Sequence, residues 1–211
     1  MDDDTRLGRA RELYERAVFG GDRAALGAAD AVLDAVEADL ALARGRVVHA
    51  RFLGARSDDP RERELFARAA TLYRGLGDSR GEGEALLWMG LYEQVVRGDH
   101  EAALPSLRRA HELATAAGDD LTRSYVVRHL GFADLAAGDL AAARARLEES
   151  VALRRALDFP AGVAAGLVAL AHLAREEGRD ADAAPLLDEA EAIARACGAA
   201  GVLAWVAEAR A

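Results

Sequence analysis

The chain repeats itself at an interval of forty residues. Small residues recur at this spacing in two sets, Gly98, Gly138 and Gly178, and Ala110, Ser150 and Ala190. A period of this length is typical of stacked helical hairpins, in which each unit contacts only its neighbours along the chain. Such stacks generally act by presenting an extended surface to a partner. The repeat therefore predicts one elongated domain over residues 1–211 that works by binding, without naming what is bound.

Turn signals divide the chain into five expected hairpins. Glycine tolerates the positive φ that ends one helix, and Asp, Ser or Pro suits the start of the next, as at Gly98-Asp99 and Gly138-Asp139. First helices are expected at 4–19, 37–56, 80–97, 121–137 and 161–177. Second helices are expected at 22–35, 60–76, 100–117, 140–157 and 180–196. A final helix at 199–211 is expected to cover the last hairpin.

Composition and apolar spacing favour an all-α fold. The chain is 52% hydrophobic but only 5% aromatic, so its core must come from Ala, Leu and Val. Alanine is the best helix former and lets backbones approach closely. Leu140, Ala143, Leu147 and Val151 fall on one helix face, and no stretch alternates as a strand does.

Charge excludes several classes of function. The net charge is −9 with both signs interleaved, whereas nucleic acid requires a basic stripe, so we expect no direct nucleic-acid partner. The chain has no Lys, which excludes lysine Schiff-base and phosphate-loop chemistry.

The acidic start Met1–Asp4 differs from a signal peptide, and no apolar run has membrane-spanning length. With the single Cys197, these features predict a cytoplasmic protein without a membrane partner.

Several strings resemble the tetratricopeptide repeat (TPR) family. They are Trp88-Met89-Gly90-Leu91-Tyr92, Gly98-Asp99 and Ala102-Ala103, and then Leu130-Gly131-Phe132, Gly138-Asp139, Ala143, Leu147 and Ser150. The family packs the helices of a hairpin closely at small residues, here Gly90, Gly131 and Ala171 facing Ala103, Ala143 and Ala183. The resemblance is clearest over 80–198. With units longer than the usual length of about 34 residues, the chain is most similar to sensor and interaction domains of bacterial regulators and actinobacterial repeat proteins.

The resemblance implies a right-handed superhelical solenoid whose first helices line a concave groove. The side chains that it places in the groove are Arg51, Trp88, Leu91, Tyr125, Arg128, Phe132, Leu135, Val168, His172 and Arg175. Helical spacing independently puts Arg128, Phe132 and Leu135 on one face. Arginine on an apolar surface can clamp a carboxylate, so an acidic peptide or an anionic small molecule would fit.

Two interpretations of these residues remain open. The arginines could instead form structural ion pairs with Glu84, Glu93 or Asp134, and the aromatic side chains could serve only inter-helix packing. His129 directly follows Arg128 and points about 100° away from it, as expected for a packed histidine.

The leading hypothesis is a non-enzymatic, regulatory adaptor that holds a peptide or partner segment with acidic groups. The alternative is a small-molecule sensor, or a biosynthetic accessory protein or enzyme, that uses the same groove. We expect no metal or cofactor, since the five histidines form no HExxH pattern and no paired cysteines accompany them. Self-association through an apolar stripe around Trp205 is a further alternative for the working surface.

Overall fold

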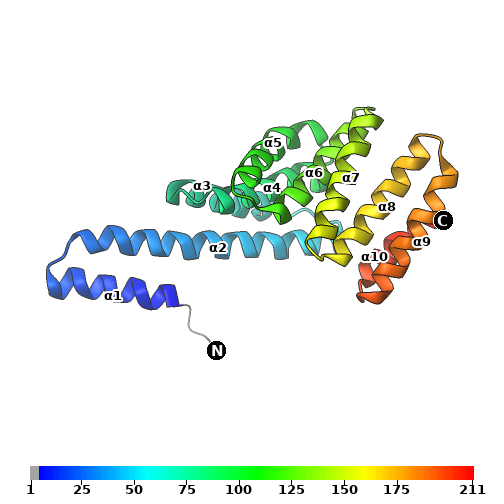
Figure 1. Cartoon of the computed structure of the whole chain (residues 1–211). Helices are drawn as coiled ribbons and strands as arrows, with labels where there is room; N and C mark the ends of the chain where they lie inside the picture. The colour runs from blue at the N-terminus through cyan, green and yellow to red at the C-terminus, as the bar shows by residue number, and fades with distance from the viewer. Residues whose placement is uncertain (1–4) are drawn as a thin grey trace.

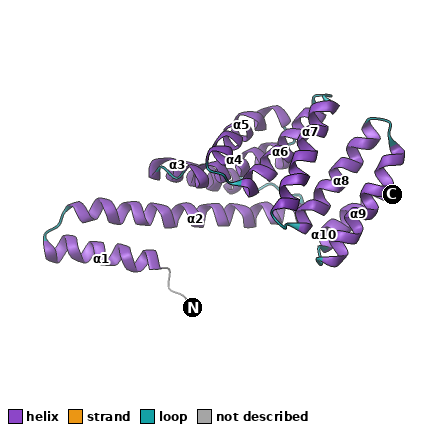
Figure 2. Ribbon diagram, in the orientation of Figure 1, coloured by secondary structure: helices purple, strands orange, loops and turns teal. Residues whose placement is uncertain are grey.

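The computed structural model describes residues 5–211, and within that range it contains ten α-helices, one π-helical segment and no strand (Figure 2). The prediction of an all-α fold is therefore confirmed. Consecutive helices pack against each other in a repeat-like stack (Figure 1). Residues 1–4, which include the acidic start and the first residue of the predicted helix 4–19, lie outside the described range. The elements are α1 (Thr5–Gly20), α2 (Ala24–Ala55), α3 (Arg61–Leu76), α4 (Ser79–Leu91), η1 (Tyr92–Val96), α5 (His100–Ala116), α6 (Asp120–Ala136), α7 (Leu140–Ala156), α8 (Pro160–Glu176), α9 (Asp180–Ala196) and α10 (Ala200–Arg210).

Recurrent turn residues end and start the helices from α3 onward. A residue in the left-handed region follows most of them, namely Gly77, Gly98, Gly118, Gly138, Gly178 and Gly198, with Asp158 in the same place at φ 51°. The side chains of Asp78, Asp99, Asp119 and Asp139 then accept a hydrogen bond from the backbone N–H three residues later. Each such cap typically contributes about 1 kcal/mol. The predicted turn chemistry is confirmed at Gly98-Asp99 and Gly138-Asp139, whereas α2, α3 and α9 start without a side-chain cap.

The π-helical segment η1 absorbs one extra residue. Successive helix-start residues at 99, 119, 139, 159, 179 and 199 are twenty apart, whereas residue 78 precedes residue 99 by twenty-one. A π-turn is wider than an α-turn and accommodates an insertion without shifting the next helix. The predicted single helix 80–97 is therefore α4 followed by η1.

Small residues allow the predicted close packing within hairpins. A Cβ added at Gly90 would lie 2.6 Å from Leu107, and one added at Gly131 would lie 3.3 Å from the Ala143 carbonyl oxygen. Ala103 and Ala143 are fully buried opposite these glycines. A larger side chain at position 90 of α4 or at position 131 of α6 would therefore force that helix away from its partner in the hairpin.

The predicted boundary between helices 22–35 and 37–56 is wrong. Both stretches form the single helix α2, which is 32 residues long. The sequence from Leu33 to Leu40 contains no Gly or Pro and consists of residues that helices tolerate, so nothing interrupts the hydrogen-bond ladder. The first two expected hairpins consequently share one helix. In Figure 1, α1 and the N-terminal part of α2 extend away from the other helices.

Candidate functional site

A cavity of about 600 Å³ lies on the side of the stack formed by every second helix. Side chains reach it from α2, α4, η1, α6, α8 and α10, so residues far apart in the sequence meet there. The lining residues are His49, Leu53, Trp88, Leu91, Val95, Tyr125, Arg128, His129, Phe132, Leu135, Val168, Ala169, His172, Trp205 and Glu208. The cavity is mostly apolar, with a few polar groups, as in typical ligand sites.

Eight of the ten residues expected in the groove line this cavity. They are Trp88, Leu91, Tyr125, Arg128, Phe132, Leu135, Val168 and His172. Helices that follow one another at a fixed interval bring the same face of each unit to the same side, which is why the periodic positions gather.

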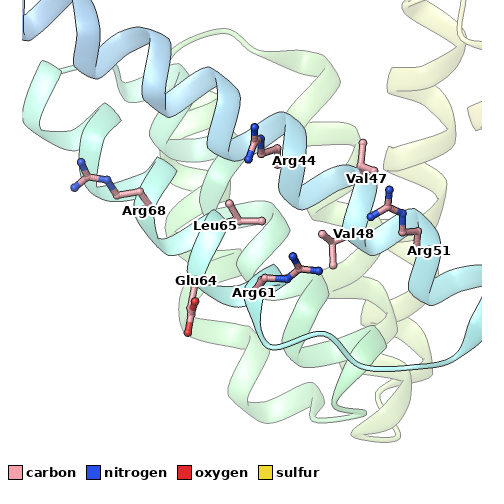
Figure 3. A pocket seen from close by; sticks show the side chains of 8 residues that line it. All are labelled: Arg44, Val47, Val48, Arg51, Arg61, Glu64, Leu65 and Arg68. Atoms are coloured by element: carbon pink, nitrogen blue, oxygen red, sulfur yellow. The ribbon is translucent and has the colours of Figure 1, made fainter.

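Arg51 and Arg175 do not line the cavity. Arg51 follows the cavity residue His49 by two positions, or about 200° round the helix, and lines a different hollow between α2 and α3 (Figure 3). Arg175 donates a hydrogen bond to the backbone carbonyl of Ala209. That carbonyl lies in the last turn of α10, where backbone oxygens lack helical partners. Neither arginine is therefore among the residues that line this cavity.

Arg128 is a cation without a carboxylate partner in residues 5–211. Its guanidinium lies 4.5 Å from the centre of the Phe132 ring. Its buried Nε makes no hydrogen bond. Burial, reinforced by repulsion from Arg154, lowers the pKa of Arg128 to about 9. The cavity therefore holds a half-buried positive charge that no carboxylate of residues 5–211 neutralises.

The three carboxylates that could have paired with Arg128 are bound to other arginines. Glu84 pairs with Arg46. Glu93 accepts from Arg63 at 3.3 Å, and Asp134 lies 2.6 Å from Arg146. Each of these three carboxylates therefore pairs with an arginine other than Arg128.

Arg154 shows what a structural arginine looks like in the same region. It is fully buried and donates to the Gly162 carbonyl at 2.9 Å, while its guanidinium lies 4.7 Å from the centre of the Tyr125 ring. Burial lowers the pKa of Arg154 to about 10. Arg154 therefore ties α7 to α8, whereas Arg128 makes no such connection.

The aromatic side chains both pack in the core and line the cavity. Trp88 stacks on Phe66 with ring centres 5.6 Å apart and meets the edge of His49 at 5.4 Å. Tyr125 lies 6.1 Å from Phe159. Inter-helix packing of these rings is therefore observed, and Trp88, Tyr125 and Phe132 also line the cavity.

His129 is a buried, neutral histidine. Its Nδ1–H donates to Gln94 Oε1 at 2.6 Å, and Gln94 Nε2 donates back to the His129 carbonyl at 3.0 Å. Burial, with repulsion from Arg128, lowers the pKa of His129 well below its usual value. His129 is packed, as expected, but it also lines the cavity, which the sequence interpretation missed.

Sequence reasoning missed six further lining residues, His49, Leu53, Val95, Ala169, Trp205 and Glu208. Val95 lies four residues after the predicted Leu91, and Ala169 directly follows the predicted Val168. The periodic pattern could therefore have indicated both. Trp205 and Glu208, three residues apart on α10, share a face that the pattern of the final helix could have indicated.

The chain matches no protein-family model and no curated protein. Among residues 5–211, no three His, Cys, Asp or Glu side chains gather in a way that could hold a metal ion. Over the same range, none of the helices combines the length and apolar character that a bilayer crossing requires.

Proposed function

We propose that this chain is a non-enzymatic binding module whose cavity holds an acidic, partly apolar segment of a protein partner. In this proposal the stack is a TPR-like, right-handed solenoid of five hairpin units, the first two of which share α2, and a terminal helix. The cavity is its concave groove. The role is regulatory, in a bacterial cytoplasm, as the resemblance implies. The guanidinium of Arg128 has no carboxylate partner in residues 5–211 and lies in a mostly apolar cavity, and this is the observation that supports this function.

A carboxylate is the chemical group that Arg128 lacks. Arginine binds carboxylates through two parallel hydrogen bonds, and burial of an arginine without a partner costs free energy that such a ligand would recover. Leu91, Phe132, Val168 and Trp205 offer apolar contact beside the charge. A segment with an apolar side chain next to an acidic group, or a peptide carboxy terminus, satisfies both features.

The first test needs no knowledge of the ligand. Replacing Arg128 by Met should raise the free energy of unfolding of the ligand-free chain by about 1 kcal/mol, because it removes an uncompensated cation and keeps the volume. The matched control is Arg154→Met, which should destabilise the chain because Gly162 loses its hydrogen-bond donor. Chemical denaturation measures both. A clear loss of stability in Arg128→Met would make Arg128 structural and refute the proposal.

The second test is binding itself. Partners captured from the native host are compared between the unaltered chain, Arg128→Glu and Arg108→Glu, an exposed arginine of α5 outside the cavity. Arg128→Glu should weaken binding of the captured segment by about 2 kcal/mol, or about thirtyfold, in titration calorimetry. Arg108→Glu should bind normally. Equal binding by all three proteins would place the working surface elsewhere.

A small carboxylate-bearing molecule is the second candidate. It is favoured by the cavity's size, which is within the range of about 300–1,000 Å³ of small-molecule sites. Trp205 and Glu208 of the terminal helix also line the cavity, so side chains from both ends of the stack converge on it. Native mass spectrometry of protein purified from its host distinguishes the two, because a retained metabolite adds a fixed small mass that Arg128→Glu should abolish.

A further inference from the structure

Helix α2 carries an exposed apolar stripe with a seven-residue period. Leu26, Leu33, Leu40 and Val47 are 44–51% exposed although they are large and apolar. Seven residues are close to two helical turns, so the four side chains follow one line along the helix for about 30 Å. This seven-residue period differs from the forty-residue repeat and is typical of helices that pair side by side.

Two hollows lie along this stripe. Leu26 and Leu33 line a shallow cavity of about 500 Å³ with Leu7 and Tyr14 of α1. Val47 lines a cavity of about 590 Å³ with residues of α3, including Leu65 (Figure 3). The stripe therefore joins two depressions that a helix from another molecule could fill.

The charges of α2 are separated along its length. Residues 24–39 include four acidic side chains and no basic one, whereas residues 40–55 include three arginines and no acidic one. Four of these charges flank the stripe, each four residues after one of its apolar positions, in the order Asp30, Glu37, Arg44 and Arg51. The flank thus reads acidic, acidic, basic, basic at seven-residue steps.

We propose that two copies of this chain pair through α2, antiparallel, about a two-fold axis that passes beside Leu40. In this arrangement Asp30 meets Arg51 of the second copy and Glu37 meets Arg44. Both pairs have the same midpoint, between residues 40 and 41, so one axis satisfies all four contacts, as an isologous interface requires. A parallel arrangement in register would instead place like charges together. The proposal is independent of the function assigned to the cavity.

The charged groups at this surface are available for such contacts. Asp30, Arg44 and Arg51 form no ion pair within residues 5–211, and Glu37 forms an exposed pair with Arg68 at 2.8 Å. Arg44, Arg51 and Arg68 with Arg61 surround the hollow in Figure 3, where Glu64 is the single acidic lining residue. The acidic half of the second copy's α2 would lie over this basic hollow and complement its charge.

The first experiment measures mass in solution. Sedimentation equilibrium of the full chain should give twice the 22.3 kDa of one chain. Leu33→Arg combined with Leu40→Arg should give one chain mass with unchanged helical circular dichroism. The matched control is Leu121→Arg, at a leucine of α6 that is similarly exposed but lies off the stripe, and it should stay dimeric. A monomeric unaltered chain at tens of micromolar would overturn the proposal.

The second experiment tests the antiparallel register. Asp30→Arg alone and Arg51→Asp alone should each weaken dimerisation at least about tenfold, because like charges then face each other. An equimolar mixture of the two variants should regain the affinity of the unaltered chain. In the mixed dimer, the arginine introduced at position 30 of one copy meets the aspartate introduced at position 51 of the other, and the unaltered Arg51 and Asp30 meet at the opposite end. Dimers that are unaffected by either change, or a mixture that does not recover, would refute this interface.

Discussion

The N-terminal hairpin and the regular units that follow it bury their leucines differently. In the regular units Leu107, Leu147 and Leu187, which are forty residues apart, are all fully buried. In the hairpin formed by α1 and residues 24–39 of α2, Leu26 and Leu33 are nearly half exposed. The core of this hairpin is a small separate cluster centred on Leu13, Ala25 and Ala29.

The difference shows how burial of a side chain depends on the sequence period at which it recurs. A residue that recurs every forty positions is covered by the next unit of the same chain, so the stack builds its own core. A residue that recurs every seven positions on one long helix has no such neighbour. Its burial requires a second helix that covers the stripe, and within residues 5–211 the side chains of the stripe stay about half exposed. Four experiments test this contrast, in order of decreasing effect.

The largest contrast is expected from shortening one leucine in each region. Leu147→Ala should lower the free energy of unfolding by about 2–5 kcal/mol, because it leaves a cavity in a fully buried site. Leu33→Ala should cost less than about 1 kcal/mol at concentrations where the chain is monomeric. Urea denaturation measures both. Similar losses at the two sites would mean that the hairpin is as tightly packed as the regular units.

Replacement of a glycine by leucine should also affect the stability differently in the two regions. Gly131→Leu should destabilise the chain by about 1–3 kcal/mol, because the space beside Gly131 is occupied by Ala143 and Leu147. Gly27→Leu on α2 meets open space and should leave the melting temperature unchanged or higher. Calorimetry that gives equal melting temperatures for Gly131→Leu and the unaltered chain would contradict the close packing of α6 on α7.

Acid sensitivity should arise in the regular units through His129. Its pKa is lowered in the folded chain, so the unfolded chain binds the proton more readily and stability falls as the pH drops below about 6.5. The loss should approach about 1.4 kcal/mol for each further pH unit until the pKa of the folded state is reached. His129→Gln should flatten this part of the stability profile. A profile of His129→Gln that runs parallel to that of the unaltered chain would exclude His129 as the source.

The smallest expected effect is that of replacing a glycine by alanine, and the change in the free energy of unfolding should have opposite signs in the two regions. Gly27→Ala should raise the free energy of unfolding by about 0.5–1 kcal/mol, since alanine favours the helix and nothing lies within 4 Å of the added methyl group. Gly90→Ala should lower it, because the methyl group would meet Leu107. Thermal unfolding followed by circular dichroism measures both. Stabilisation by Gly90→Ala would show that the space between α4 and α5 accommodates an additional methyl group.

The sequence by itself determined the all-α fold, the turns other than the one predicted at residue 36, and most of the side chains that meet at the cavity. Gly98 and Gly138 take the positive φ that the turns require, and eight of the ten predicted groove residues share one cavity. These features follow from local rules repeated at a fixed interval, since a helix start, a left-handed turn residue and an apolar face each depend on a few neighbouring residues.

Only the tertiary structure decided which charges remain free. Arg51 and Arg175 look like Arg128 in the sequence, yet one lies in another hollow and the other is bound to the Ala209 carbonyl. Glu84, Glu93 and Asp134 pair with other arginines, and Arg128 has no carboxylate partner in residues 5–211. Pairing among long side chains depends on distances between helices that are far apart in the sequence. A periodic pattern fixes the direction of each side chain but not the partner that it reaches.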